Sequence, residues 1–121
     1  MSVSSALQDE PIGYDEWQRV IARNVSAELE PRARRRHRRY AVQGEVKASF
    51  VLGEKTYKRT WRLLEVSATG LTVKSHEPLP GDVFFLMSVD MDGDPVCLRG
   101  EAVHSTQTLG GFKTGIRLQF P

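Results

Sequence analysis

The chain has 121 residues, of which 40% are hydrophobic and 26% are charged, and its formal net charge is +2. This size and composition predict one globular domain with one core and exclude an intrinsically disordered protein. The small net charge excludes a surface that is basic all over, as a general DNA-coating protein would have. Cys97 is the single cysteine, so an intrachain disulfide is excluded. Together with an N-terminus that lacks a signal-peptide pattern, this predicts a cytoplasmic protein with no membrane insertion.

Residues 1–30 predict a loose tail followed by an amphipathic helix. Asp15 has the side chain of a helix cap, and Gln18 three residues later completes a capping-box pattern. Pro31 is expected to end the helix. Apolar residues recur at four-residue spacing before it: Trp17, Ile21, Val25 and Leu29. We expect this stripe to pack on the body of the domain, with docking on another protein as the alternative.

Residues 31–40 form an arginine-rich linker. Six arginines lie within eight residues: Arg32, Arg34, Arg35, Arg36, Arg38 and Arg39. Residues 1–30 contain six acidic and two basic residues, and residues 40–121 contain nine of each. Positive charge is therefore focused at one point. Arginine matches phosphate oxygens with two parallel donors and stacks on flat bases, although such a run also suits a solvated linker or a nucleic-acid contact.

Residues 41–121 predict an all-β domain of six short strands. In the first strand, the even-numbered positions from Val42 to Leu52 should face the core, with Gly44 as a bend. The later strands are expected at 57–63, from 71, at 83–90, at 96–104 after an Asp92-Gly93 hairpin turn, and from 112. The last strand should bury four residues: Phe112, Ile116, Leu118 and Phe120. Strands this short and evenly spaced predict a small closed or nearly closed barrel, and closure leaves no edge strand exposed.

The stretch "EVSATGL" forms a Ser-x-x-Gly turn between the second and third strands. Ser67 offers a hydroxyl donor, and Gly70 permits a positive φ and a close approach of the backbone to a ligand. A turn of this kind is common on its own, so its meaning depends on what accompanies it.

The arginine run and this turn together resemble the PilZ domain family, whose motifs are RxxxR in a linker and [D/N]xSxxG between two strands. The resemblance covers roughly Arg34 to Phe120 and includes "RRHRRYAV", "LEVSATGLTV", "PLPGDVFFL" and "TGIRLQF". It implies a six-stranded antiparallel PilZ-like β-barrel that binds cyclic di-GMP. The ligand-binding residues that it implies are Arg35, Arg39, Glu65, Ser67 and Gly70, with Arg34, Arg36 and Arg38 as further candidates because Arg34 and Arg38 satisfy the same spacing one residue earlier.

The resemblance implies a bacterial second-messenger receptor that relays the signal to an unidentified protein partner, for instance in motility or biofilm regulation. Glu65 stands where the family has Asp or Asn, so the alternative is a degenerate PilZ-like interaction module that does not bind nucleotide. Nucleic-acid binding through the arginine run is a second alternative. Against it, the run lacks interleaved aromatic residues and the rest of the barrel is neutral.

No pattern in the sequence indicates an enzyme, a metal site or a cofactor other than the cyclic di-GMP ligand. The histidines, His37, His76 and His104, show no metal-ligand spacing with Cys97. Neither a phosphate-cradling loop nor a nucleophile elbow is present. The acidic stretch from Asp90 to Asp94 is interpreted as a hairpin turn rather than a calcium loop, because Pro95 and a strand follow it.

Overall fold

The computed structural model describes residues 10–25 and 38–121. They form one helix and six strands: α2 (Tyr14–Asn24), β1 (Arg39–Leu52), β2 (Lys55–Ser67), β3 (Gly70–Ser75), β4 (Phe85–Met91), β5 (Asp94–Thr108) and β6 (Gly111–Gln119). Each predicted strand is present, and β1 already begins at Arg39, inside the segment expected to be linker. The all-β prediction with one N-terminal helix is therefore confirmed.

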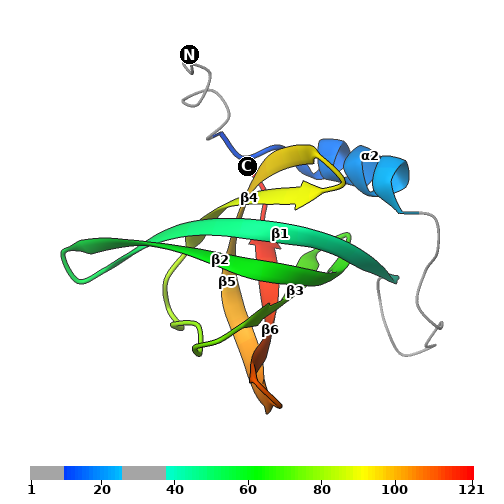
Figure 1. Cartoon of the computed structure of the whole chain (residues 1–121). Coiled ribbons are helices and arrows are strands. Elements are labelled where there is room, and N and C mark those ends of the chain that lie inside the picture. Colours follow the sequence, from blue (N-terminus) through cyan, green and yellow to red (C-terminus); the bar gives the residue numbers. More distant parts are fainter. Residues whose placement is uncertain (1–9, 26–37) are drawn as a thin grey trace.

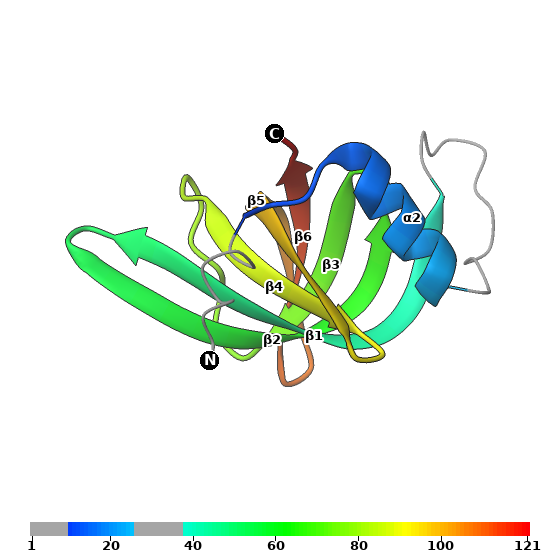
Figure 2. The same cartoon turned by 90° about the horizontal axis from the view of Figure 1, so that it is seen from above.

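The six strands close into a barrel-like ring in which every neighbouring pair is antiparallel. Their order is β1-β2-β3-β6-β5-β4, and β4 pairs back onto β1 (Figures 1 and 2). The predicted turn between β4 and β5 has positive φ at both Asp92 (61°) and Gly93 (82°). Two such residues form the turn that matches the twist of a two-residue hairpin, as the Asp-Gly pair predicted.

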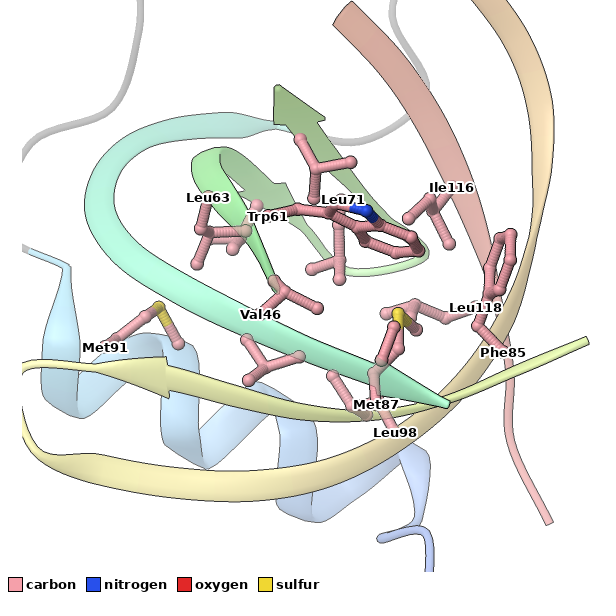
Figure 3. Packing of buried hydrophobic residues seen from close by; sticks show 14 of the residues in the cluster. Val46, Trp61, Leu63, Leu71, Phe85, Met87, Met91, Leu98, Ile116 and Leu118 are labelled. Carbon is pink, nitrogen blue, oxygen red and sulfur yellow. The ribbon is translucent and has the colours of Figure 1, made fainter. Parts of the chain in front are cut away.

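Alternation along the strands fills the ring with one hydrophobic core, whose packing is seen in Figure 3. Val46, Ala48 and Phe50 are buried in β1, while Glu45 and Lys47 point to solvent, as predicted. In β6, Ile116 and Leu118 are buried as predicted, whereas Phe112 near its start and Phe120 just after its end are half-buried. Val42 is also half-buried.

Leu52 corrects the predicted alternation, because its side chain is 41% exposed. β1 pairs with β4 only from Glu45 to Ser49, and β2 pairs with β3 only from Arg62 onward. Residues 51–60 therefore form a two-stranded arm, which extends away from the ring at the left of Figures 1 and 2. The core ends where the arm begins, so Leu52 has nothing to pack into.

The bend predicted at Gly44 is a register shift in β1, between Ala41 and Gly44. A side chain at Gly44 would collide with the carbonyl oxygen of Asp90 on β4. A glycine is needed here because the two backbones approach too closely for a Cβ atom.

Helix α2 begins and ends at other residues than predicted. Its N-cap is Gly13, which makes no side-chain capping bond, so the assignment of Asp15 as the cap is wrong. Asp15 and Glu16 lie instead in the first turn, where carboxylates complement the helix dipole. The helix stops at Asn24 because Val25 is extended, well before Pro31. Leu29 lies outside the described residues.

The apolar face of α2 packs on the ring, which confirms the packing prediction. Trp17 and Val20 are fully buried and Ile21 is nearly so. The indole Nε1 of Trp17 donates a 2.9 Å hydrogen bond to the carbonyl oxygen of Ser67, at the end of β2. At the other end of α2, Arg23 donates a 2.8 Å hydrogen bond to Asp94 at the β4–β5 hairpin. The helix is thus fixed across one end of the ring.

The single cysteine and the length of the helix were also subjects of the sequence analysis. Cys97, the single cysteine of the chain, is buried and forms no disulfide. Within residues 10–25 and 38–121, no helix is long and apolar enough to cross a membrane.

Candidate functional site

Four of the five principal predicted site residues meet at one pocket on the outer face of the ring. Arg39, Glu65, Ser67 and Gly70 line a hollow of about 180 Å³. The pairing of β1 with β2 brings them together, because it sets Arg39 directly opposite Ser67. The fifth residue, Arg35, lies outside the described residues, as do the further candidates Arg34 and Arg36.

Arg38 lies elsewhere. It lines a separate hollow between α2 and the start of β1, with Tyr14, Gln18 and Tyr40. Ala68 of the Ser-x-x-Gly turn also lines that hollow. Of the two neighbours Arg38 and Arg39, Arg39 is the one that lines the same pocket as Ser67 and Gly70.

The carboxylate of Glu65 is held between two strands. Its Oε1 lies 3.6 Å from the Nη1 of Arg39 on β1 and accepts a 3.5 Å hydrogen bond from the Oγ1 of Thr72 on β3. Both distances are long for charge-assisted contacts, which are typically about 2.7–2.9 Å. The side chain of Arg39 is 40% exposed, against 19% for Glu65. The pair leaves the guanidinium open to solvent and able to take an anionic ligand.

The Ser-x-x-Gly turn presents a weakly held hydroxyl. The Oγ of Ser67 lies 3.4 Å from the carbonyl oxygen of Gly70, to which it donates, and 3.4 Å from the backbone nitrogen of Thr69, from which it accepts. Hydrogen bonds of this length are close to the limit, so the hydroxyl can turn to a better partner at little cost.

Gly70 is not needed for a positive φ, which was one of the two reasons predicted for it. Its φ is not among the positive values in the described residues. A Cβ at this position would lie 2.9 Å from the carbonyl oxygen of Ile116 on β6 and 3.7 Å from the Oγ of Ser67. The glycine allows β3 and β6 to approach each other at the floor of the pocket.

Sequence reasoning missed the far wall of the pocket, which comes from β5 and β6. His104, Gly115 and Arg117 line it. Strand pairing places Gly115 opposite Thr72 on one side and opposite His104 on the other, and sets Arg117 opposite Gly70. The Nη2 of Arg117 donates a 2.7 Å hydrogen bond to Glu101. The only sequence signal was the two-residue spacing of Lys113, Gly115 and Arg117, which places all three on one face of the last strand.

A second and larger hollow, of about 640 Å³, lies at the base of the β1–β2 arm, under the segment that follows β3. Its lining is mostly aromatic and apolar: Phe50, Leu52, Tyr57, Trp61, Pro78, Leu79 and Pro80 are among its residues. Arg59 and Glu77 form a loose ion pair there, with 3.9 Å between Nε and Oε1. None of the residues from the Ser-x-x-Gly turn takes part in it.

The described part of the chain brings together no group of three or more histidine, cysteine, aspartate or glutamate side chains that could hold a metal ion. No protein-family model matches the chain, and no match was found among characterised proteins.

Proposed function

We propose that the protein is a cyclic di-GMP receptor that resembles the PilZ family, and that the small pocket holds the nucleotide. The observation that carries the proposal is the convergence of Arg39, Ser67 and Gly70 at one hollow of the outer face. Positions 39 and 67 are far apart in sequence and are opposite each other in the sheet. In this proposal the protein has no catalytic activity of its own.

The chemistry of the ligand suits these groups. A cyclic dinucleotide carries two phosphodiester charges, and its two guanines present acceptors at O6 and N7 that arginine recognises with paired donors. Arg39 is partly exposed and only loosely paired. The Ser67 hydroxyl has long, easily exchanged hydrogen bonds. Arg35, the other arginine of the RxxxR motif, would supply the second guanidinium.

The contact between Trp17 and Ser67 offers a route from the pocket to α2. The carbonyl oxygen of Ser67 accepts a hydrogen bond from the buried indole of Trp17, while the hydroxyl of the same residue lines the pocket. A ligand that shifts the Ser-x-x-Gly turn therefore acts on the anchor of the helix. The protein partner would sense the placement of α2 relative to the ring.

A second candidate is an interaction module that binds no nucleotide, and one contact favours it. Glu65 already offers Arg39 a negative charge at 3.6 Å, so a phosphate must share or displace this partner. An exposed ion pair of this kind is worth about 0.2–1 kcal/mol, whereas a charged hydrogen bond to a ligand is worth about 1.5–3 kcal/mol. The contact with the ligand is therefore the more favourable of the two, and we prefer the receptor function to the interaction module.

Calorimetric titration of the full chain with cyclic di-GMP tests the proposal. Wild type should bind, and Ser67→Ala should weaken binding by about two- to tenfold, as expected for the loss of one neutral hydrogen bond. Ser88→Ala is the matched control, because Ser88 is an exposed serine on β4 outside the residues lining the pocket. A chain that binds no cyclic di-GMP would leave the interaction module as the better proposal.

Duplex DNA is the second titrant. A protein that neutralises about six phosphates loses roughly a thousandfold in affinity between low and physiological salt, whereas a ligand with two charges loses far less. Steeply salt-dependent binding to DNA without binding to cyclic di-GMP would contradict the receptor proposal.

A further inference from the structure

The imidazole of His104 lies over Gly115 on the neighbouring strand. A Cβ added at Gly115 would be 2.5 Å from Cε1, 3.0 Å from Nε2 and 3.1 Å from Nδ1 of this ring. All three ring atoms are close to one point, so the ring lies across the strand rather than pointing away from it. Gly115 is the residue that makes this possible, because any side chain there would occupy the place of the ring.

A bulge in β5 directs His104 into this position. The register of β5 against β6 shifts between Ala102 and His104, so that Ala102 faces Ile116 and His104 faces Gly115. Val103 is the additional residue. A bulge of this kind turns the next side chain and is frequent beside functional sites. His104 is exposed, so the face of its ring that is turned away from Gly115 borders the pocket.

Cationic residues lie on both sides of the ring along the outer face of β6. Gly115 stands between Lys113 and Arg117, each two residues away, which corresponds to about 7 Å along a strand. Lys113 is opposite Lys74 on β3, and Lys74 is opposite Arg62 on β2. Like charges directly opposite each other destabilise a sheet. The side chains of Arg62, Lys74 and Lys113 form no hydrogen bond or ion pair with another described residue, so this row has positive charge to offer an anion.

We propose that the ring of His104, seated on Gly115, is a stacking platform for one purine base of the bound nucleotide. The inference rests on the proposed function and adds the subsite for the base. A base seated on the ring would have cationic side chains on either side for the attached phosphate. Histidine is among the side chains on which nucleobases stack, and each such contact strengthens binding substantially. The ligand class for this subsite is therefore an anionic nucleotide with a flat base.

Two variants of His104 separate stacking from polar contacts. In calorimetric titration with cyclic di-GMP, His104→Ala should weaken binding by roughly five- to a hundredfold. His104→Phe keeps a flat ring without polar atoms and should bind like wild type. The platform is wrong if His104→Ala binds as tightly as wild type, or if His104→Phe is weakened as much as His104→Ala.

Gly115→Ala tests the seat of the ring without changing His104. The added Cβ would displace the imidazole, which is exposed and can move, so the fold should persist by circular dichroism. Binding should fall as in His104→Ala, and the double variant should be no weaker than either single variant, because both remove the same contact. Wild-type affinity in Gly115→Ala, or additive losses in the double variant, would overturn the platform.

Ser67→Ala and Arg39→Ala distinguish the platform from the proposed function. If these variants lose affinity while both His104 variants retain it, the receptor stands and the platform falls. If wild type itself shows no binding to cyclic di-GMP, the receptor and its base subsite fall together.

Discussion

Two hollows of the ring, the small pocket at the Ser-x-x-Gly turn and the large hollow at the base of the arm, hold similar charged pairs in different surroundings. Arg39 and Glu65 are 3.6 Å apart in the small pocket, and Arg59 and Glu77 are 3.9 Å apart in the large one. The two arginine side chains are 40% and 45% exposed. Each hollow is lined by one serine and one histidine, Ser67 with His104 in the first and Ser75 with His76 in the second. The first hollow adds two glycines, whereas aromatic rings and prolines line the second.

The large hollow is an opening onto the core. Phe50 and Trp61 line it, and each packs edge-on against the buried ring of Phe85, with centroids 5.3 and 5.0 Å away. Its size follows from the arm leaving the ring at this point. The small pocket has less volume and more convergent polar groups. The difference teaches that the choice of the small pocket as the proposed site rests on convergence of polar side chains rather than on volume.

The largest expected effect separates core from site. Trp61→Ala removes an aromatic side chain that is only 5% exposed, and it should lower the free energy of unfolding by about 3–5 kcal/mol in urea denaturation. Under native conditions the folded protein should still bind cyclic di-GMP. Unchanged stability with loss of binding would mean that the large hollow, and not the small pocket, receives the ligand.

The next effect compares the two arginines directly. Arg39→Ala should weaken cyclic di-GMP binding by roughly ten- to a hundredfold, because it removes charged hydrogen bonds worth about 1.5–3 kcal/mol. Arg59→Ala removes the same charge from an equally exposed arginine of the large hollow and should leave affinity unchanged in the same titration.

Equal losses in both variants would mean that only general positive charge matters. Within the arginine run, Arg35→Ala should weaken binding of cyclic di-GMP. Arg36→Ala is its control, because it removes the same charge and should leave binding unchanged. Sensitivity at Arg34 and Arg38 instead would shift the motif by one residue.

A smaller effect is expected when Glu65 is shortened. Glu65→Asp draws the carboxylate back from Arg39, so the guanidinium becomes more available to the ligand. Affinity should stay equal or rise by at most about fivefold, the value of an exposed ion pair. A marked loss in calorimetry would show that Glu65 itself is fitted to the ligand, and that the longer carboxylate belongs to this pocket.

The smallest effect lies outside both hollows. Hydrogen bonds from Arg23 and Asn24 hold the pKa of Asp94 below its ordinary value. A lowered pKa in the folded state means that this contact stabilises the protein above the ordinary pKa of aspartate, and that the contribution is lost as the pH falls through the folded value. Between about pH 5 and pH 3, the melting temperature of Asp94→Asn should therefore fall less than that of wild type. Its affinity for cyclic di-GMP at neutral pH should not change.

The part of the site that could be predicted is the part contributed by two consecutive strands. Arg39, Glu65 and Ser67 lie on two strands joined by one hairpin, so a motif reading places them together. His104 and Arg117 reach the pocket only because β6 inserts between β3 and β5, a pairing that alternation does not reveal. Even the adjacency of Gly115 and His104 depends on a bulge, which shifts the register by one residue.

Alternation predicted the fold well as long as each strand had neighbours on both sides. It placed Val46, Ala48 and Phe50 inside the ring correctly. It failed at Leu52 because the pattern of one strand does not tell where its neighbour stops. The start of α2 was misjudged for a related reason: Asp15 has the side chain of a cap, but the chain already turns into the helix at Gly13.

The β1–β2 arm has a consequence for how molecules of this protein meet in concentrated solution. A closed ring has no unpaired strand edge, but beyond Ser49 β1 pairs only with β2, and before Arg62 β2 pairs only with β1. Backbone groups on the outer edges of the arm can therefore pair with another copy, and Val51, 58% exposed, offers such a contact an apolar surface. Lys55, Lys58 and Arg59 give the arm a positive charge that repels a second copy. We therefore expect salt, which screens this repulsion, to promote self-association of the chain.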